Sequence, residues 1–222
     1  MTVRNPMVFW YDFASPYCYL AAERVGRLSQ AVASRVEWRP FLLGPLFRQH
    51  HPDGLPRQQM SAAARTNKWR DLERLAADLR IPFAPDRESY PPNGLRAARL
   101  VLGLASRQVP EAQVNDMALA IFRAAFRKGQ DISDLSVLRG LLADAGLPAE
   151  LAEAAGTDTV KRQLIDNGAE AEAAGIFGAP SFVVTTGDGT QELFFGQDRL
   201  DQALRWSGIP VGDPADAGQA AR

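Results

Sequence analysis

The segment Ser15-Pro16-Tyr17-Cys18 contains residues whose types and spacing could do chemistry. It follows Asp12-Phe13-Ala14 and has the form of a two-cysteine redox motif in which a serine replaces the leading cysteine. A serine hydroxyl is too weakly acidic to act as a redox centre, but it can donate a hydrogen bond to the sulfur anion of a small thiol. The segment therefore indicates an enzyme that obtains its thiolate from a bound thiol. The alternative is that Ser15 only caps the helix that Pro16 begins.

A second motif lies late in the chain, in the segment Phe177-Gly-Ala-Pro-Ser-Phe-Val-Val184. Pro180 directly precedes a predicted strand, where thioredoxin-like folds carry a cis proline that faces the redox motif. A proline there leaves the backbone N–H and C=O of Ala179 able to pair with an extended peptide ligand. The alternative is an ordinary proline at the beginning of a strand.

A third candidate is the turn at Gly196 and the helix start that follows it. The first N–H groups of a helix bind carboxylates, and the carboxylate of Asp198 can accept from an amino group. With Gln197, this turn would suit the two charges at the γ-glutamyl end of glutathione. Helix capping by Asp198 is the simpler alternative.

Composition limits the possible partners. The 25 basic and 26 acidic residues nearly cancel, so neither nucleic acid nor an anionic membrane surface is an expected partner. No apolar stretch has the length of a membrane span, and the N-terminus does not resemble a secretion signal. Cys18 is the only cysteine, which excludes an intramolecular disulfide and fits a reducing compartment. We therefore expect a cytoplasmic protein in which Cys18 is a small buried apolar residue.

Hydrophobic spacing predicts the secondary structure. The predicted elements, in chain order, are a strand at 7–13, a helix from Pro16 to about Ala33, a strand at 35–41, helices around 69–79, 114–125 and 135–145, strands at 181–184 and 192–195, and a helix at 196–206. The order is β-α-β, a helical insertion, then β-β-α, which is a thioredoxin fold interrupted in the middle. The predicted parts are the N-terminal part of the thioredoxin fold at 1–42, the inserted helical domain at 43–174, the C-terminal part at 175–209 and a flexible tail at 210–222.

Two loops rich in proline and glycine, 44–58 and 81–94, are expected to face a ligand. His50 and His51 are adjacent in the earlier loop and cannot share a helical face. We therefore interpret them as loop residues and not as a metal-binding pair.

Together these segments resemble the kappa-class glutathione transferases and the 2-hydroxychromene-2-carboxylate isomerases, a branch of the DsbA-like thioredoxin superfamily. The segments that carry the resemblance are FWYDFASPYCYLA, VEWRPFLLG, KWRDLERLAADLRIPF, NGLRAARL, IFGAPSFVV and ELFFGQDRLDQAL. The resemblance implies a glutathione-dependent enzyme that is usually a homodimer.

The resemblance also implies roles for individual residues. Ser15 would contact the glutathione sulfur, Ala179 beside Pro180 would pair with the tripeptide backbone, and Gln197 and Asp198 would hold the γ-glutamyl group. Asn93 would lie near the pocket for a small aromatic substrate, or would simply form a turn before a helix. Lys68, Trp69 and Arg70 match a helix that lies near the active site in this family, but Trp69 fits an apolar stripe and is interpreted as packing.

The reaction expected from the resemblance is cis-trans isomerisation of an intermediate of aromatic catabolism by reversible thiolate addition. One alternative is a kappa-like transferase or peroxidase that consumes glutathione. Another is a thiol–disulfide oxidoreductase that uses Cys18 together with glutathione. A third is a binding protein without catalytic activity.

Overall fold

The computed structural model of the chain describes residues 5–28, 36–50 and 59–209. The strands are β1 (Met7–Tyr11), β2 (Val36–Pro40), β3 (Ser181–Thr185) and β4 (Gln191–Phe195). The helices are α1 (Pro16–Gly26), α3 (Leu43–His50), α4 (Ala62–Asp78), α5 (Leu95–Ser106), α6 (Glu111–Arg127), α7 (Leu135–Asp144), α8 (Asp158–Ala173) and α9 (Leu200–Trp206), with short 3₁₀ helices η1 (Ala149–Gly156) and η2 (Gln197–Arg199). This order confirms the predicted thioredoxin fold with helices between its two halves.

The strands form one sheet in the order β2-β1-β3-β4. Strand β1 is parallel to β2 and antiparallel to β3, and Phe9 lies opposite both Trp38 and Phe182. Strands β3 and β4 form the predicted antiparallel hairpin. Because β1 is an inner strand, the loop that follows it is positioned by pairing on both sides.

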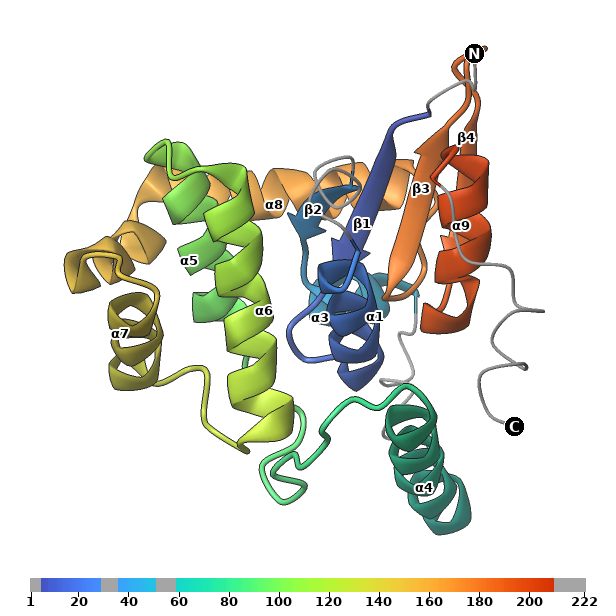
Figure 1. The fold of residues 1–222 in the computed structure, drawn as a ribbon, viewed down its shortest axis with the longest axis horizontal. Helices are drawn as coiled ribbons and strands as arrows, with labels where there is room; N and C mark the ends of the chain where they lie inside the picture. Colours follow the sequence, from blue (N-terminus) through green and yellow to red (C-terminus); the bar gives the residue numbers. More distant parts are fainter. Residues whose placement is uncertain (1–4, 29–35, 51–58, 210–222) are drawn as a thin grey trace.

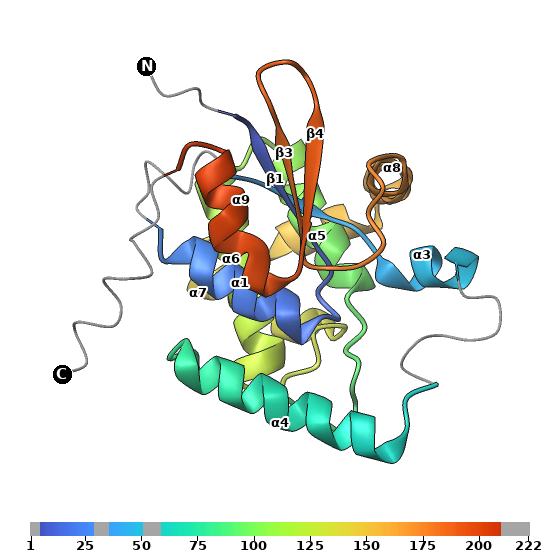
Figure 2. The same cartoon turned by 90° about the vertical axis from the view of Figure 1, so that its right-hand side faces the viewer.

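Alternate residues of β1 bury on opposite faces of the sheet, as the period of a strand requires. Phe9 and Tyr11 join the core formed with α1, α6 and α9, whereas Trp10 joins a smaller core with Leu46 of α3 and Ala171 of α8. Figure 2 shows α1 and α9 on one side of the sheet and α3 and α8 on the other. The sheet is therefore covered on both faces.

Besides α3 and α8, which cover one face of the sheet, the α-helices described between β2 and β3 are α4, α5, α6 and α7. Figure 1 shows α5, α6 and α7 grouped together, with α4 at a distance from them. The grouped helices contact α1, because a Cβ atom at Gly26 would lie only 2.8 Å from a methyl group of Leu119 on α6. Among the described residues, no helix is long and apolar enough to cross a membrane.

The structure corrects the predicted end of the helix that begins at Pro16. Helix α1 stops at Gly26, and the N–H groups of Arg27 and Leu28 turn back to the carbonyls of Arg24 and Val25 at 3.3 and 3.1 Å. These short-range bonds close the last turn before the predicted end. Residues 29–35 and the predicted flexible tail at 210–222 lie outside the described residues.

The structure also corrects the predicted loop at 44–58. Its beginning is helix α3, of which His50 is the last residue, and His51 lies outside the described residues. Pro45 stands in the opening turn, where a helix needs no N–H donor. Leu46 is buried against the sheet, and this packing outweighs the local signal of Gly44 and Pro45.

Candidate functional site

The site is built on the loop that joins β1 to α1. Ser15 is the N-cap of α1, with extended backbone angles, and Pro16 occupies the opening position of the helix. The Ser15 Oγ accepts a hydrogen bond from the Cys18 N–H at 3.3 Å. The capping role that sequence suggested for Ser15 is therefore real, and it places the hydroxyl at the positive end of a helix.

The Ser15 hydroxyl also makes a long-range contact. It donates to the carbonyl oxygen of Ala179 at 3.3 Å, across a separation of 164 residues. The Ala179–Pro180 peptide bond is cis, an isomer that the sequence alone could not establish. Strand pairing brings Ser15 and Ala179 together, because Trp10 near the end of β1 lies opposite Ser181 at the start of β3. The two predicted motifs thus form one site.

The loop that carries Ala179 is fixed from both sides. The Ser181 hydroxyl donates to the Gly178 carbonyl at 2.9 Å, and the Gly196 N–H donates to the Pro180 carbonyl at 2.9 Å. Ala179 is half-buried, and Ser15 is only 6% exposed. This anchoring gives the Ala179 backbone a defined direction beside Ser15.

The third motif lies after β4. Gly196 has a φ of 105°, and an added Cβ atom would lie 2.5 Å from the Asp198 carboxylate, so only glycine fits this turn. Gln197 is buried, whereas the Asp198 side chain is 63% exposed and lies 3.7 Å from Arg199. Asp198 is therefore accessible to a ligand, and the Gln197 side chain is not free to turn outward.

Arg24 explains why Gln197 is held inward. Its guanidinium, from the last turn of α1, donates to the Gln197 backbone carbonyl, to the Gln197 Oε1 at 3.3 Å and to Asp201 at 2.7 Å. These bonds tie η2 and the start of α9 to the helix that Ser15 begins. Sequence reasoning missed Arg24, because its partners are far along the chain and no local pattern identifies them.

Asp12 is a second residue that sequence reasoning missed. Its carboxylate is buried and accepts from the Ala14 N–H at 2.8 Å and from the Leu43 N–H at 2.7 Å. Its backbone carbonyl accepts from the Ser15 N–H at 3.0 Å. Burial raises the pKa of Asp12, and the two backbone hydrogen bonds act in the opposite direction. The sequence signal that could have identified Asp12 is its position, since it is a carboxylate between a buried strand and the serine motif.

Asn93 lies in the turn before α5. Its Oδ1 accepts from the Leu95 N–H at 3.2 Å, which is the turn-forming role proposed as its alternative. The next residue, Gly94, packs so closely on the site loop that an added Cβ would lie 2.9 Å from the Phe13 Cβ. The exposed Asn93 is thus on a turn that contacts the segment leading to Ser15.

Cys18 is completely buried on the opening turn of α1, as expected. Desolvation raises the pKa of its thiol to about 12, although the hydrogen bond with Ser15 opposes this change. The thiol is therefore protonated at neutral pH. Trp69 is half-buried against the core, which agrees with packing, and Lys68 donates to the Tyr90 hydroxyl at 2.9 Å.

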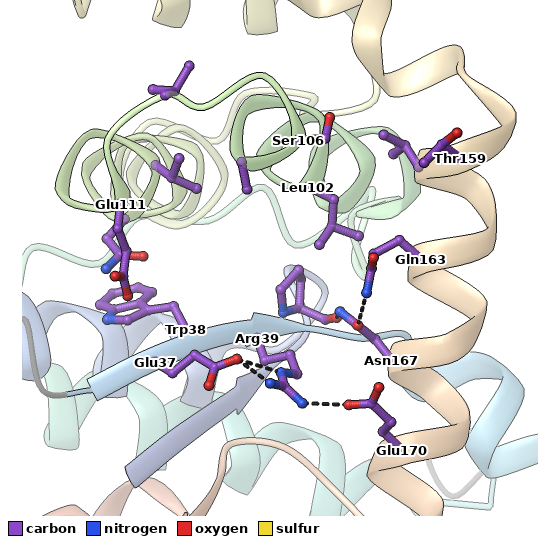
Figure 3. Close-up of a pocket in the computed structure, with 16 residues that line it drawn as sticks. Glu37, Trp38, Arg39, Leu102, Ser106, Glu111, Thr159, Gln163, Asn167 and Glu170 are labelled. Atoms are coloured by element: carbon purple, nitrogen blue, oxygen red, sulfur yellow. Dashed lines mark hydrogen bonds and ion pairs between the residues drawn. The ribbon is translucent and has the colours of Figure 1, made fainter. Parts of the chain in front are cut away.

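A cavity of about 570 Å³ lies elsewhere, between β2 and helices α5, α6 and α8. None of the predicted site residues lines it. Figure 3 shows that its polar side chains bind one another: Gln163 donates to Asn167 at 3.2 Å, and Arg39 donates to Glu170 at 2.5 Å. We therefore place the candidate site at Ser15 and not in this cavity.

Comparison with known proteins agrees with this geometry. The profile of the DSBA-like thioredoxin domain matches residues 7–205. The chain belongs to this family. Within the DSBA-like family, it is 27% identical over 220 residues to glutathione S-transferase kappa 2 from Caenorhabditis elegans, with 96% of each protein covered.

Two further comparisons concern one kind of enzyme. The chain is 27% identical over 204 residues to the 2-hydroxychromene-2-carboxylate isomerase of Sphingobium xenophagum, covering 87% of this chain and 93% of the relative. A solved structure of a 2-hydroxychromene-2-carboxylate isomerase matches with a TM-score of 0.74 at 21% identity, over 97% of both chains. The structural match confirms the fold, and the named relatives support an enzyme of the DSBA-like family.

Proposed function

We propose that this protein is a glutathione-dependent cis-trans isomerase of the 2-hydroxychromene-2-carboxylate isomerase type. The observation that carries the proposal is the contact between the Ser15 hydroxyl and the Ala179 carbonyl at the N-terminus of α1. It joins a donor suited to a sulfur anion with a backbone carbonyl suited to an extended peptide. The named relatives support both glutathione use and this reaction class.

The residues of the site fit a bound tripeptide thiol. The chain's own thiol is buried and its pKa is raised, which argues against Cys18 as the nucleophile; in the proposed reaction the thiol comes from glutathione. Asp198 is exposed and can accept from an ammonium group, while the start of η2 provides N–H groups for a carboxylate. Arg24 holds η2 in place through Gln197 and Asp201.

The chemistry that glutathione supplies is reversible thiolate addition to a conjugated double bond, which permits rotation before the thiolate leaves. Ser15 would turn its hydroxyl from Ala179 toward the sulfur and keep that atom ionised and aimed. The N-terminus of α1 favours the same negative charge. Ala179 would then be available to the tripeptide backbone. We further propose a cytoplasmic homodimer that acts on a small aromatic substrate and binds neither nucleic acid nor membranes.

The test is the Ser15→Ala variant, assayed for isomerisation of 2-hydroxychromene-2-carboxylate at saturating glutathione. Loss of one donor to a developing anion lowers kcat by roughly a hundredfold or more. The fraction of bound glutathione in the thiolate form, followed by its ultraviolet absorbance, should fall in parallel. Cys18→Ala is the matched control on the same helical turn and should isomerise normally. Wild-type activity in Ser15→Ala would remove Ser15 from the mechanism.

The kappa-class relative favours one alternative, a transferase that spends glutathione. The same assay separates the two, because isomerisation leaves the total amount of free glutathione unchanged over many turnovers. Consumption of one glutathione per product would assign the chain to the transferase reaction instead.

A further inference from the structure

A cavity of about 310 Å³ lies between α3, α5 and α8, away from the residues proposed to bind glutathione. Its walls are mainly apolar and include Leu46 from α3 and Leu164 and Ile165 from α8. Ile165 is 70% exposed, which is unusual for a large apolar side chain. The volume is at the small end of the range for ligand pockets, so it suits one compact molecule.

Arg99 of α5 is the exceptional residue in this wall. Its Nε is buried, and none of the residues that the structure describes accepts a hydrogen bond from it. Other arginines of the same region are paired, since Arg96 donates to the Ser133 carbonyl at 2.5 Å and Arg123 donates to Glu23 at 2.7 Å. A buried donor without an acceptor is destabilising and calls for an explanation.

The neighbouring charged groups do not neutralise Arg99. Two other charged residues, Lys161 and Glu172, line the same cavity. Lys161 pairs with Asp158 at 2.9 Å, and no ion pair between Glu172 and Arg99 is found among the described residues. Arg99 also borders a second cavity, but the carboxylate there, Glu153, pairs with Arg139 at 2.6 Å. Arg99 thus lines an apolar pocket, and its guanidinium makes no hydrogen bond or ion pair with any residue that the structure describes. Its Nε is enclosed by protein, so the terminal nitrogens are the atoms available to a ligand.

We propose that the cavity between α3, α5 and α8 binds a small apolar carboxylate, with the carboxylate on Arg99 and the apolar body against Leu46, Leu164 and Ile165. Aromatic and short aliphatic acids share this chemistry. A guanidinium recognises a carboxylate with charge-assisted hydrogen bonds, and apolar walls supply the remaining affinity. The proposal is independent of the glutathione chemistry, because Ser15, Ala179 and Gln197 do not line this cavity.

The charge requirement is tested with 2-naphthoate and its neutral counterpart 2-naphthalenemethanol, each titrated into the protein by calorimetry. We expect naphthoate to bind roughly ten- to a hundredfold more tightly than the alcohol, as for hydrogen bonds to a charged group. Arg99→Gln should remove this preference, whereas Arg107→Gln, at the end of the same helix, should retain it. Equal affinities for acid and alcohol in the wild-type protein would overturn the proposal.

The location is tested by filling the cavity from Gly168, which lines it on α8. A Cβ atom at Gly168 meets nothing within 4 Å, and the same is true at Gly140 on α7, which does not line the cavity. Gly168→Leu should abolish naphthoate binding without lowering the melting temperature, and Gly140→Leu should bind as the wild-type protein does. Unchanged binding in Gly168→Leu, or no binding in the wild-type protein, would refute the proposed site.

Discussion

At the scale of single residues, the Ser15 hydroxyl and the Cys18 thiol lie three positions apart in the chain but have different surroundings. The Ser15 hydroxyl faces Ala179, while the thiol of Cys18 is buried beneath the helix. Their chemistry differs because one is at the edge of the site and the other is in the core. An oxidoreductase that depends on Cys18 would need this core to open.

Cys18 should accordingly be unreactive in the folded protein. Its pKa is raised to about 12 from a reference of 9.0, so an aromatic disulfide reagent should label it only after denaturation. The same rise in the pKa of Cys18 makes the stability of the fold depend on pH. The protonated thiol favours folding fully below the unfolded pKa, and this contribution is lost as pH rises through the interval up to about 12. Rapid stoichiometric labelling of the native protein at neutral pH would contradict the buried assignment.

Much of the residue-level site could be predicted from sequence, because Ser15 and Pro180 stand at fixed points of the element order. Asp12, Arg24 and Arg99 could not be predicted in the same way. Asp12 binds the N–H of Leu43, and Arg24 binds residues at 197 and 201, so their roles depend on contacts between distant segments. Arg99 is notable only because its buried Nε has no hydrogen-bond acceptor among the described residues, and no sequence pattern predicts this.

At the scale of elements, α1 positions both ends of the proposed glutathione site. Ser15 stands at its beginning, and Arg24 in its last turn secures η2. The hydrophobic spacing predicted this helix but not where it ends. The end is set by backbone hydrogen bonds within residues 24–28, which the spacing of apolar residues does not reveal. For α3 the local composition indicated a loop, and burial of Leu46 with the Asp12 contact at Leu43 favoured a helix instead.

Arg24→Gln should weaken glutathione binding selectively. Loss of the bonds to the Gln197 carbonyl and to Asp201 releases η2, so we expect a several-fold higher KM for glutathione with kcat little changed. Arg27→Gln is the control, because Arg27 donates to the carbonyls of Leu79 and Arg80 at 2.6 and 2.9 Å and contacts no part of the site. An equal rise in KM in both variants would indicate a general loss of structure.

At the scale of the whole molecule, the helical insertion is joined to the thioredoxin part by packing and, among the described residues, by ion pairs from β2 (Arg39 with Glu170) and from α1 (Glu23 with Arg123). Glu23 of α1 is buried and accepts from the Nε and Nη2 of Arg123 on α6 at 2.7 and 2.8 Å. The pair raises the pKa of Arg123, chiefly through the hydrogen bond with Glu23. Since α1 also begins at Ser15, the insertion supports the helix that carries the site.

Arg123→Leu should destabilise the protein by about 1–3 kcal/mol, because it leaves the Glu23 carboxylate buried without its partner. Arg139→Leu is the matched control, since its pair with Glu153 is exposed and should contribute less than about 1 kcal/mol. Urea denaturation of both variants, with the Glu23→Leu/Arg123→Leu double variant, measures the difference. If Arg123→Leu were as stable as Arg139→Leu, the ion pair would not join the two parts.

The bond between the Ser15 hydroxyl and the Ala179 carbonyl also sets a condition on which thiols can be used. When Ser15 rotates toward a sulfur, the carbonyl of Ala179 loses its donor and requires another. A peptide thiol brings an amide N–H that can replace it, whereas a simple alkyl thiol of equal acidity cannot. Selectivity for a peptide over a bare mercaptan would thus arise from this exchange of partners and not from the size of the opening.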